Sequence, residues 1–147
     1  MTRIQISRQI REQILSALRA AYPEEGCGAL IGREAEETVL AITAAEALPN
    51  AEPVRGEDRF IIEPHAYAEL EQRLAGQGDG SRIVGFFHSH PDGIARPSSV
   101  DLEAAAGLYE VTRTYYVYAI AALATNSAEM TFWMLNAAAD DFVEVRA

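Results

Sequence analysis

The 147-residue chain contains no lysine and a single cysteine, Cys27. All of its 12 basic residues are arginines, and 22 aspartates and glutamates outweigh them to give a formal net charge of -10. This balance argues against a nucleic-acid partner, because proteins that bind nucleic acid need a basic surface. A lone cysteine excludes an intramolecular disulfide and the cysteine-rich zinc sites of fingers and ribbons.

Long hydrophobic runs are also absent from the sequence. A membrane-spanning helix needs about 20 consecutive apolar residues, and no stretch approaches that length. The N-terminus, MTRIQISRQIREQ, has no apolar core of the kind found in signal peptides. We therefore expect a cytoplasmic protein without a membrane partner, folded as one domain over residues 1–147.

Hydrophobic periodicity predicts strands and helices interspersed along the chain. The expected strands are Ile4–Ile6, Cys27–Ile31, Thr38–Thr43, Arg59–Glu63, Ile83–Phe87, Tyr115–Leu123, Glu129–Leu135 and Phe142–Val145. Three helices are expected. The first begins after the N-cap Ser7 and ends before Pro23, the second runs from Pro64 to about Leu74, and the third runs from about Ser98 to Tyr109. We expect turns at Glu34–Glu36 and Asn126–Ser127, and a helix break at Gly76, Gly78 and Gly80. This order predicts a mixed α/β (α+β) fold, a central mixed sheet flanked by about three helices.

The stretch from Ile83 to Asp101, IVGFFHSHPDGIARPSSVD, contains most of the residues that suggest chemistry. An apolar strand ends in His88 and His90, and a strand places residues i and i+2 on the same face. Both imidazoles can therefore converge on one point, with Ser89 facing the other way. Pro91 cannot donate to a strand ladder, so we expect the strand to stop there and the chain to turn.

Two histidines and Asp101 make a three-ligand set that would leave a fourth zinc position open, as in catalytic zinc sites. A zinc hydrolase also needs a carboxylate base that is not a ligand, and the best candidates are Glu24 and Glu25, just before a buried strand. Ser98 could donate a hydrogen bond to the oxyanion that forms when water attacks a carbonyl.

Each of these residues also has a purely structural interpretation. An H-x-H pair at a strand end can be incidental, and Ser98-x-x-Asp101 matches a helix capping box, which is compatible with a ligand role. Glu24 and Glu25 could form a solvated acidic turn. Cys27 is typical of a small buried hydrophobic residue rather than a nucleophile.

The combination of motifs is more specific than its parts. The pattern H-x-H-P-x6-S-x2-D, with PEEGCG at residues 23–28 upstream, resembles the JAMM (MPN+, JAB-domain) metalloisopeptidase family. The resemblance implies that His88, His90 and Asp101 bind one zinc ion per chain and that Ser98 steadies the tetrahedral intermediate. It also selects Glu25 over Glu24 as the residue that takes a proton from the attacking water and passes it to the leaving amine.

The chain is close to the minimal domain of this family, and therefore looks like its stand-alone prokaryotic members. That resemblance implies a zinc-dependent peptidase or isopeptidase that cuts the amide bond after the C-terminal Gly-Gly of a ubiquitin-like sulfur-carrier protein. Two alternatives stay open: a non-catalytic MPN-type binding module, and a zinc peptidase acting on small peptides. The short length excludes a barrel amidohydrolase, and the lack of a P-C-x-x-C element excludes a zinc deaminase.

Overall fold

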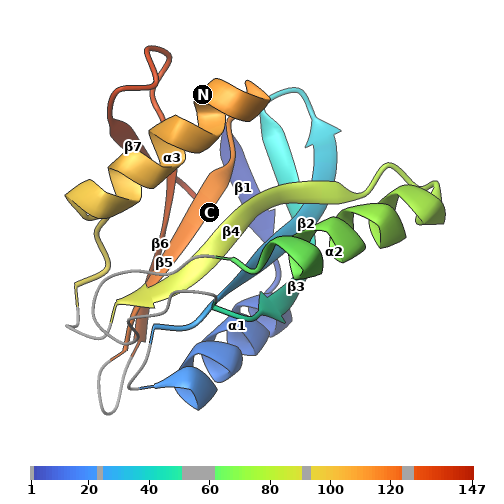
Figure 1. Ribbon diagram of the computed structural model, residues 1–147. Helices are drawn as coiled ribbons and strands as arrows, with labels where there is room; N and C mark the ends of the chain where they lie inside the picture. Colours follow the sequence, from blue (N-terminus) through green and yellow to red (C-terminus); the bar gives the residue numbers. More distant parts are fainter. Residues whose placement is uncertain (1, 23–24, 51–61, 91–93, 124–127) are drawn as a thin grey trace.

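The computed structural model describes residues 2–22, 25–50, 62–90, 94–123 and 128–147 (Figure 1). Its elements are β1 (Arg3–Ile6), α1 (Arg8–Ala21), β2 (Cys27–Glu36), β3 (Val39–Leu48), α2 (Pro64–Gln77), β4 (Arg82–His90), α3 (Ser99–Thr112), β5 (Val117–Leu123), β6 (Ala128–Leu135) and β7 (Phe142–Val145). This is the mixed α/β fold that the sequence predicts, with a central sheet and helices around it. Among the described helices, none is long and apolar enough to span a bilayer.

The strands join into one sheet in the order β1-β3-β2-β4-β5-β6-β7. β4 lies at its centre, antiparallel to β2 and parallel to β5, so the sheet is mixed. The two outer strands also meet, since Arg3 bridges to Arg146 and the N–H of Ile4 donates to the carbonyl of Arg146 at 2.8 Å. The sheet therefore curls until its edges touch.

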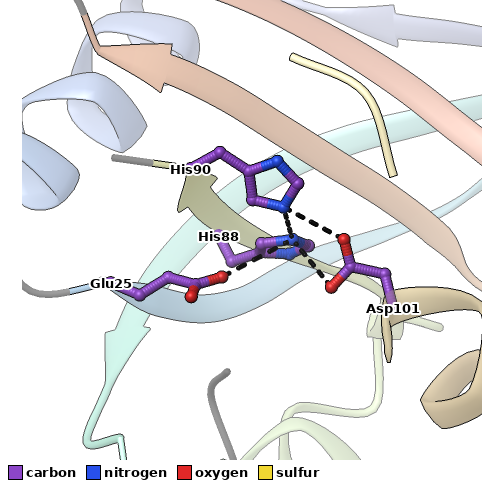
Figure 2. Close-up of side chains that lie close together, drawn as sticks. All are labelled: Glu25, His88, His90 and Asp101. Carbon is purple, nitrogen blue, oxygen red and sulfur yellow. Dashed lines mark hydrogen bonds and ion pairs between the residues drawn. The ribbon is translucent and has the colours of Figure 1, made fainter. Parts of the chain in front are cut away.

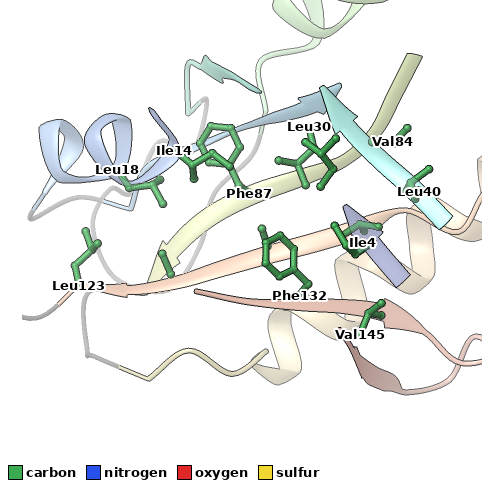
Figure 3. Close-up of a cluster of buried hydrophobic side chains, with 14 residues drawn as sticks. Ile4, Ile14, Leu18, Leu30, Leu40, Val84, Phe87, Leu123, Phe132 and Val145 are labelled. Carbon is green, nitrogen blue, oxygen red and sulfur yellow. The ribbon is translucent and has the colours of Figure 1, made fainter. Parts of the chain in front are cut away.

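Helices pack on both faces of β4, because neighbouring strand residues point to opposite sides of a sheet. Phe87 belongs to a cluster that includes Leu18 of α1 (Figure 3). Phe86 belongs to a second cluster, with Leu70 of α2 and Ala105 of α3. Burying a side chain such as Phe87 contributes about 1.5–3 kcal/mol, so contacts on two sides hold the strand that ends in the histidines.

The hairpin of β2 and β3 is longer than predicted. The prediction of a turn at Glu34–Glu36 is wrong, because β2 continues to Glu36 and the chain turns at Glu37 and Thr38. Thr38 adopts φ 68, the left-handed conformation that tight turns require. The outer half of β2 is exposed, so its backbone pairing with β3 leaves no hydrophobic pattern in the sequence.

Other boundaries also differ from the predicted ones. α2 passes through Gly76 and ends only at Gly78, whose φ of 68 supplies the left-handed C-cap. α3 continues to Thr112, and β5 begins at Val117. Glu63 is the N-cap of α2 rather than the end of a strand.

Three sequence predictions fall partly or wholly outside the described residues. Positions 59–61 of the expected strand at Arg59–Glu63 lie there, and Ile62 itself forms an isolated bridge to Asn50. The turn expected at Asn126–Ser127 and the chain reversal expected from Pro91 onward also lie there.

Candidate metal centre

β4 brings two histidines to one face of the sheet. His88 and His90 are 1% and 6% exposed, and Ser89 between them points to the opposite face. The Ser89 hydroxyl accepts a hydrogen bond from the N–H of Gly26 at 3.0 Å, and the Ser89 N–H donates to the Gly26 carbonyl at 3.2 Å. With Cys27 in register opposite His88, these bonds tie the segment before β2 to the end of β4.

Glu25 immediately precedes Gly26, the residue that is hydrogen-bonded to Ser89, and is 1% exposed. Its carbonyl accepts a hydrogen bond from Nδ2 of Asn50 at 3.2 Å, which fixes the backbone on its other side. Its Oε1 lies 3.9 Å from Nε2 of His88. The glutamate selected by the resemblance is thus beside the histidines, whereas Glu24 lies outside the described residues.

The N-terminus of α3 supplies the second carboxylate. Ser98 is the N-cap, and its hydroxyl accepts from the N–H of Asp101 at 3.1 Å. In return Oδ2 of Asp101 accepts from the N–H of Ser98 at 2.9 Å, which confirms the predicted capping box. Because both bonds restrain the first turn, they also fix the position of the Asp101 carboxylate, which is buried.

Figure 2 shows the four side chains pointing toward one another from three parts of the chain. The Nε2 atoms of His88 and His90 are 3.1 Å apart. Asp101 places Oδ2 3.0 Å from Nε2 of His90 and Oδ1 3.4 Å from Nε2 of His88. One ligand atom from each residue, Glu25 included, lies within 4.8 Å of all the others.

The carbonyl of Ile94 sets the protonation of His90. Nδ1 of His90 lies 3.0 Å from this oxygen, and a carbonyl only accepts, so Nδ1 must hold a proton. Nε2 is therefore the nitrogen that can bind a metal. Burial alone would lower the pKa of His90, but the hydrogen bond to Asp101 and the charge of that carboxylate raise it overall.

Burial lowers the pKa of His88, and the neighbouring Asp101 offsets only part of that shift. For Asp101 itself burial acts to raise the pKa, yet the hydrogen bonds from His88 and His90 hold it well below the usual carboxyl value. A neutral His88 and an ionised Asp101 are the forms that bind metal ions. The two Nε2 atoms lie 3.1 Å apart, and the Asp101 carboxylate lies 3.0 Å from one and 3.4 Å from the other, so the three side chains are close enough together to hold one ion.

Two anchoring residues were not assigned a role from the sequence. Ser89 was predicted only to face away from the histidines, and Asn50 had no predicted chemistry. Both act through a hydrogen bond to the backbone at Glu25 or Gly26, far away in sequence, so no local spacing could have indicated them. Cys27 is a buried thiol, as predicted, and burial and the charge of Glu25 raise its pKa to about 12.

The fold and this cluster together define the class of protein. It is a mixed α/β protein whose central strand ends in a buried pair of histidines, joined by two carboxylates from other elements. Such a set of nitrogen and oxygen atoms can hold a metal ion.

Comparison with known proteins identifies the family. Residues 7–136 match the family model described as prokaryotic homologs of the JAB domain. The chain is 32% identical over 111 residues to a desampylase of Haloferax volcanii, a match that covers 71% of this chain and 74% of the relative. This protein therefore belongs to the prokaryotic JAB-domain family, which confirms the resemblance drawn from the H-x-H-P-x6-S-x2-D pattern.

Two solved structures share the fold. A protein of Desulfitobacterium hafniense has a TM-score of 0.76 at 24% identity, covering 97% of this chain and 90% of that chain. A protein of Salinibacter ruber has a TM-score of 0.67 at 30% identity, covering 97% of this chain and 91% of that chain.

Proposed function

We propose that this protein is a zinc-dependent peptidase or isopeptidase that hydrolyses the amide bond after the C-terminal Gly-Gly of a ubiquitin-like sulfur-carrier protein. The observation that supports it most strongly is the buried convergence of Glu25, His88, His90 and Asp101. Residues 1–147 act in this proposal as one domain, since a single sheet joins strands from both ends of the chain.

Zinc suits the donor set better than a hard cation does. Two imidazole nitrogens and one carboxylate are a usual ligand set for catalytic zinc, whereas magnesium and calcium prefer oxygen ligands alone. We assign His88, His90 and Asp101 as the ligands of one ion per chain. The chemistry that zinc supplies in such a site is Lewis acidity, which makes water nucleophilic at neutral pH.

Glu25 is assigned as the general base. Its Oε1 is 3.9 Å from Nε2 of His88, farther than the 3.0–3.4 Å that separates the other donor atoms, which supports a place beside the ligands rather than among them. A carboxylate there can accept a proton from the attacking water and donate it to the leaving amine. Asn50 and Ser89 hold the backbone from which this side chain extends.

Ser98 is assigned as the donor to the oxyanion. A hydroxyl has one donor and two acceptor positions, so its oxygen can accept from the N–H of Asp101 while its proton points elsewhere. Capping and catalysis therefore use different parts of the same group. A donor aimed at the developing negative charge typically contributes about 10²–10³ in kcat.

The substrate class rests on the family resemblance and on the relative at 32% identity, named a desampylase, which favours a protein substrate over a small peptide. The test is to incubate the zinc-reconstituted protein with Gly-Gly carrier fusions extended by a short sequence, and to detect cleavage by mass spectrometry. We expect cleavage after Gly-Gly that a chelator abolishes, together with much slower cleavage of unstructured peptides.

Glu25→Gln should abolish cleavage, whereas Glu69→Gln, an exposed change on α2, should leave it intact. Tight carrier binding without cleavage by the zinc-loaded protein would contradict the proposal and favour a binding module. Equal rates on short peptides and folded carriers would contradict the substrate class alone.

A further inference from the structure

Thr131 of β6 lies on the same face of the sheet as the candidate metal centre. Residues that pair across neighbouring strands point their side chains to the same side. His88 of β4 pairs with Ile120 of β5, and Ile120 in turn pairs with Thr131. Thr131 is therefore two strands away from His88, on the face to which the histidines point, although β6 supplies none of the four cluster residues.

The hydroxyl of Thr131 holds the segment that leads from β4 to α3. Its Oγ1 donates to the carbonyl of Ala95 at 2.7 Å, and Nε1 of Trp133 donates to the same Oγ1 at 2.8 Å. An indole N–H only donates and a carbonyl only accepts, so the direction of both bonds is fixed and the hydroxyl proton points to Ala95. Ala95 is 7% exposed, so this segment is packed as well as hydrogen-bonded where it crosses the sheet.

Ala95 follows Ile94, the residue whose carbonyl lies 3.0 Å from Nδ1 of His90. Each peptide unit is planar, so only the φ and ψ angles of Ala95 lie between the Ile94 carbonyl and the Ala95 carbonyl. Anchoring the second carbonyl to Thr131 therefore limits the directions in which the first can point. The same segment is restrained at its other end, because Ser98 takes part in the capping box of α3.

We propose that Thr131 is a positioning residue for the metal centre: through Ala95 it keeps the carbonyl of Ile94 on Nδ1 of His90, and so keeps Nε2 of His90 directed at the ion. This inference rests on the proposed function, because it takes His90 as a zinc ligand. Loss of an outer partner that orients a histidine ligand typically lowers metal affinity by about 10–100-fold. Thr131 acts one step farther out than the Ile94 carbonyl, so we expect the lower end of that range.

The experiment measures zinc affinity, by competition with a chelator, for the wild type, Thr131→Val and Thr131→Ser. Valine has nearly the shape of threonine but no hydroxyl, so it takes away the donor to the Ala95 carbonyl. We expect Thr131→Val to bind zinc about tenfold more weakly, whereas Thr131→Ser, which keeps the hydroxyl, should stay close to the wild type.

NMR spectra of the zinc-loaded protein give a second measurement, the exchange of the His90 Nδ1 proton with solvent. This proton should exchange slowly in the wild type and in Thr131→Ser, because the Ile94 carbonyl binds it, and faster in Thr131→Val. A residue that only stabilised the fold would change the melting temperature without changing this signal or the zinc affinity of the folded protein.

Thr43→Val on β3 is the matched control. It removes a hydroxyl that donates to a strand carbonyl elsewhere, that of Ile31 at 3.4 Å, and should leave zinc affinity unchanged. Trp133→Phe keeps the Thr131 hydroxyl but removes the N–H that orients it. It should therefore lose less affinity than Thr131→Val, with faster exchange of the His90 Nδ1 proton, and it serves as the test if Thr131→Val does not fold.

Three results would overturn the inference and leave the proposed function standing. They are wild-type zinc affinity in Thr131→Val, an equal loss of affinity in Thr131→Val and Thr131→Ser, and unchanged exchange of the His90 Nδ1 proton in Trp133→Phe. A folded wild-type protein that binds no zinc would overturn both the inference and the proposed function.

Discussion

Replacing Ser98 by glycine separates its two proposed roles. As an N-cap, Ser98 accepts from the N–H of Asp101 at 3.1 Å, and replacing a serine cap by alanine costs about 1 kcal/mol. Glycine is a far better cap and costs only a few tenths of a kcal/mol, and the extended backbone here, φ -88 and ψ 171, suits it. Ser98→Gly thus removes the hydroxyl while leaving the helix nearly as stable.

Stability cannot account for the expected loss of activity. A domain of this size is stable by about 5–15 kcal/mol, so a change of a few tenths leaves nearly all molecules folded. Loss of an oxyanion donor lowers kcat by about 10²–10³, or about 2.7–4 kcal/mol in the transition state. We therefore expect Ser98→Gly to retain zinc and to unfold within about 2 °C of the wild type, with at least about a hundredfold lower kcat.

Ser7 provides the matched control on α1. Its hydroxyl caps that helix by accepting from the N–H of Ile10 at 3.2 Å, in a similar backbone conformation. Ser7→Gly should shift the melting temperature about as much as Ser98→Gly and leave kcat unchanged. If Ser98→Gly cleaves the carrier at the wild-type rate, Ser98 is a cap and nothing more, and the oxyanion assignment is wrong.

Further predictions concern the Cys27 thiol, two glycines and the pairing of Asp101 with His90. With a pKa of about 12 and 4% exposure, Cys27 should react with iodoacetamide far more slowly at pH 8 in the folded protein than in urea; equal rates would contradict its burial. A Cβ at Gly85 would overlap the backbone of β5, so Gly85→Ala should lower the free energy of unfolding by several kcal/mol. Gly107 on α3 has open space around it, so Gly107→Ala should raise the free energy of unfolding by about 0.5–1 kcal/mol. Urea unfolding measures both changes. In metal-free protein the lowered pKa of Asp101 adds stability above about pH 3.9 and the raised pKa of His90 adds it below about pH 6.5. Asp101→Asn should therefore lose most stability between those values, and a loss independent of pH would refute the pairing.

The parts of the site that lie close together in sequence were predictable. The alternation of a strand puts His88 and His90 on one face, and the capping box fixes Asp101 relative to Ser98. Both patterns depend on backbone geometry over a few residues. The mixed α/β fold follows in the same way from the order of apolar runs.

The remaining parts depend on contacts between distant segments. Glu25 reaches the histidines only because β2 pairs with β4 with Cys27 opposite His88, and strand register between distant segments has no local sequence signal. The choice of Glu25 over Glu24 as the general base rests on the family resemblance rather than on periodicity. The hydrogen bond of Asn50 depends on tertiary structure in the same way. The Glu34–Glu36 turn was misplaced because an exposed ladder is stabilised by backbone hydrogen bonds rather than by burial.

Native mass spectrometry of the zinc-reconstituted protein tests the central claim most directly. We predict one zinc ion per folded chain for the wild type and for Glu25→Gln, and none for His90→Ala, because His90 is assigned as a ligand and Glu25 as the base. Folded wild-type protein without zinc would contradict the proposed metal site. Loss of zinc from Glu25→Gln would instead make Glu25 a ligand and leave the proposed mechanism without its base.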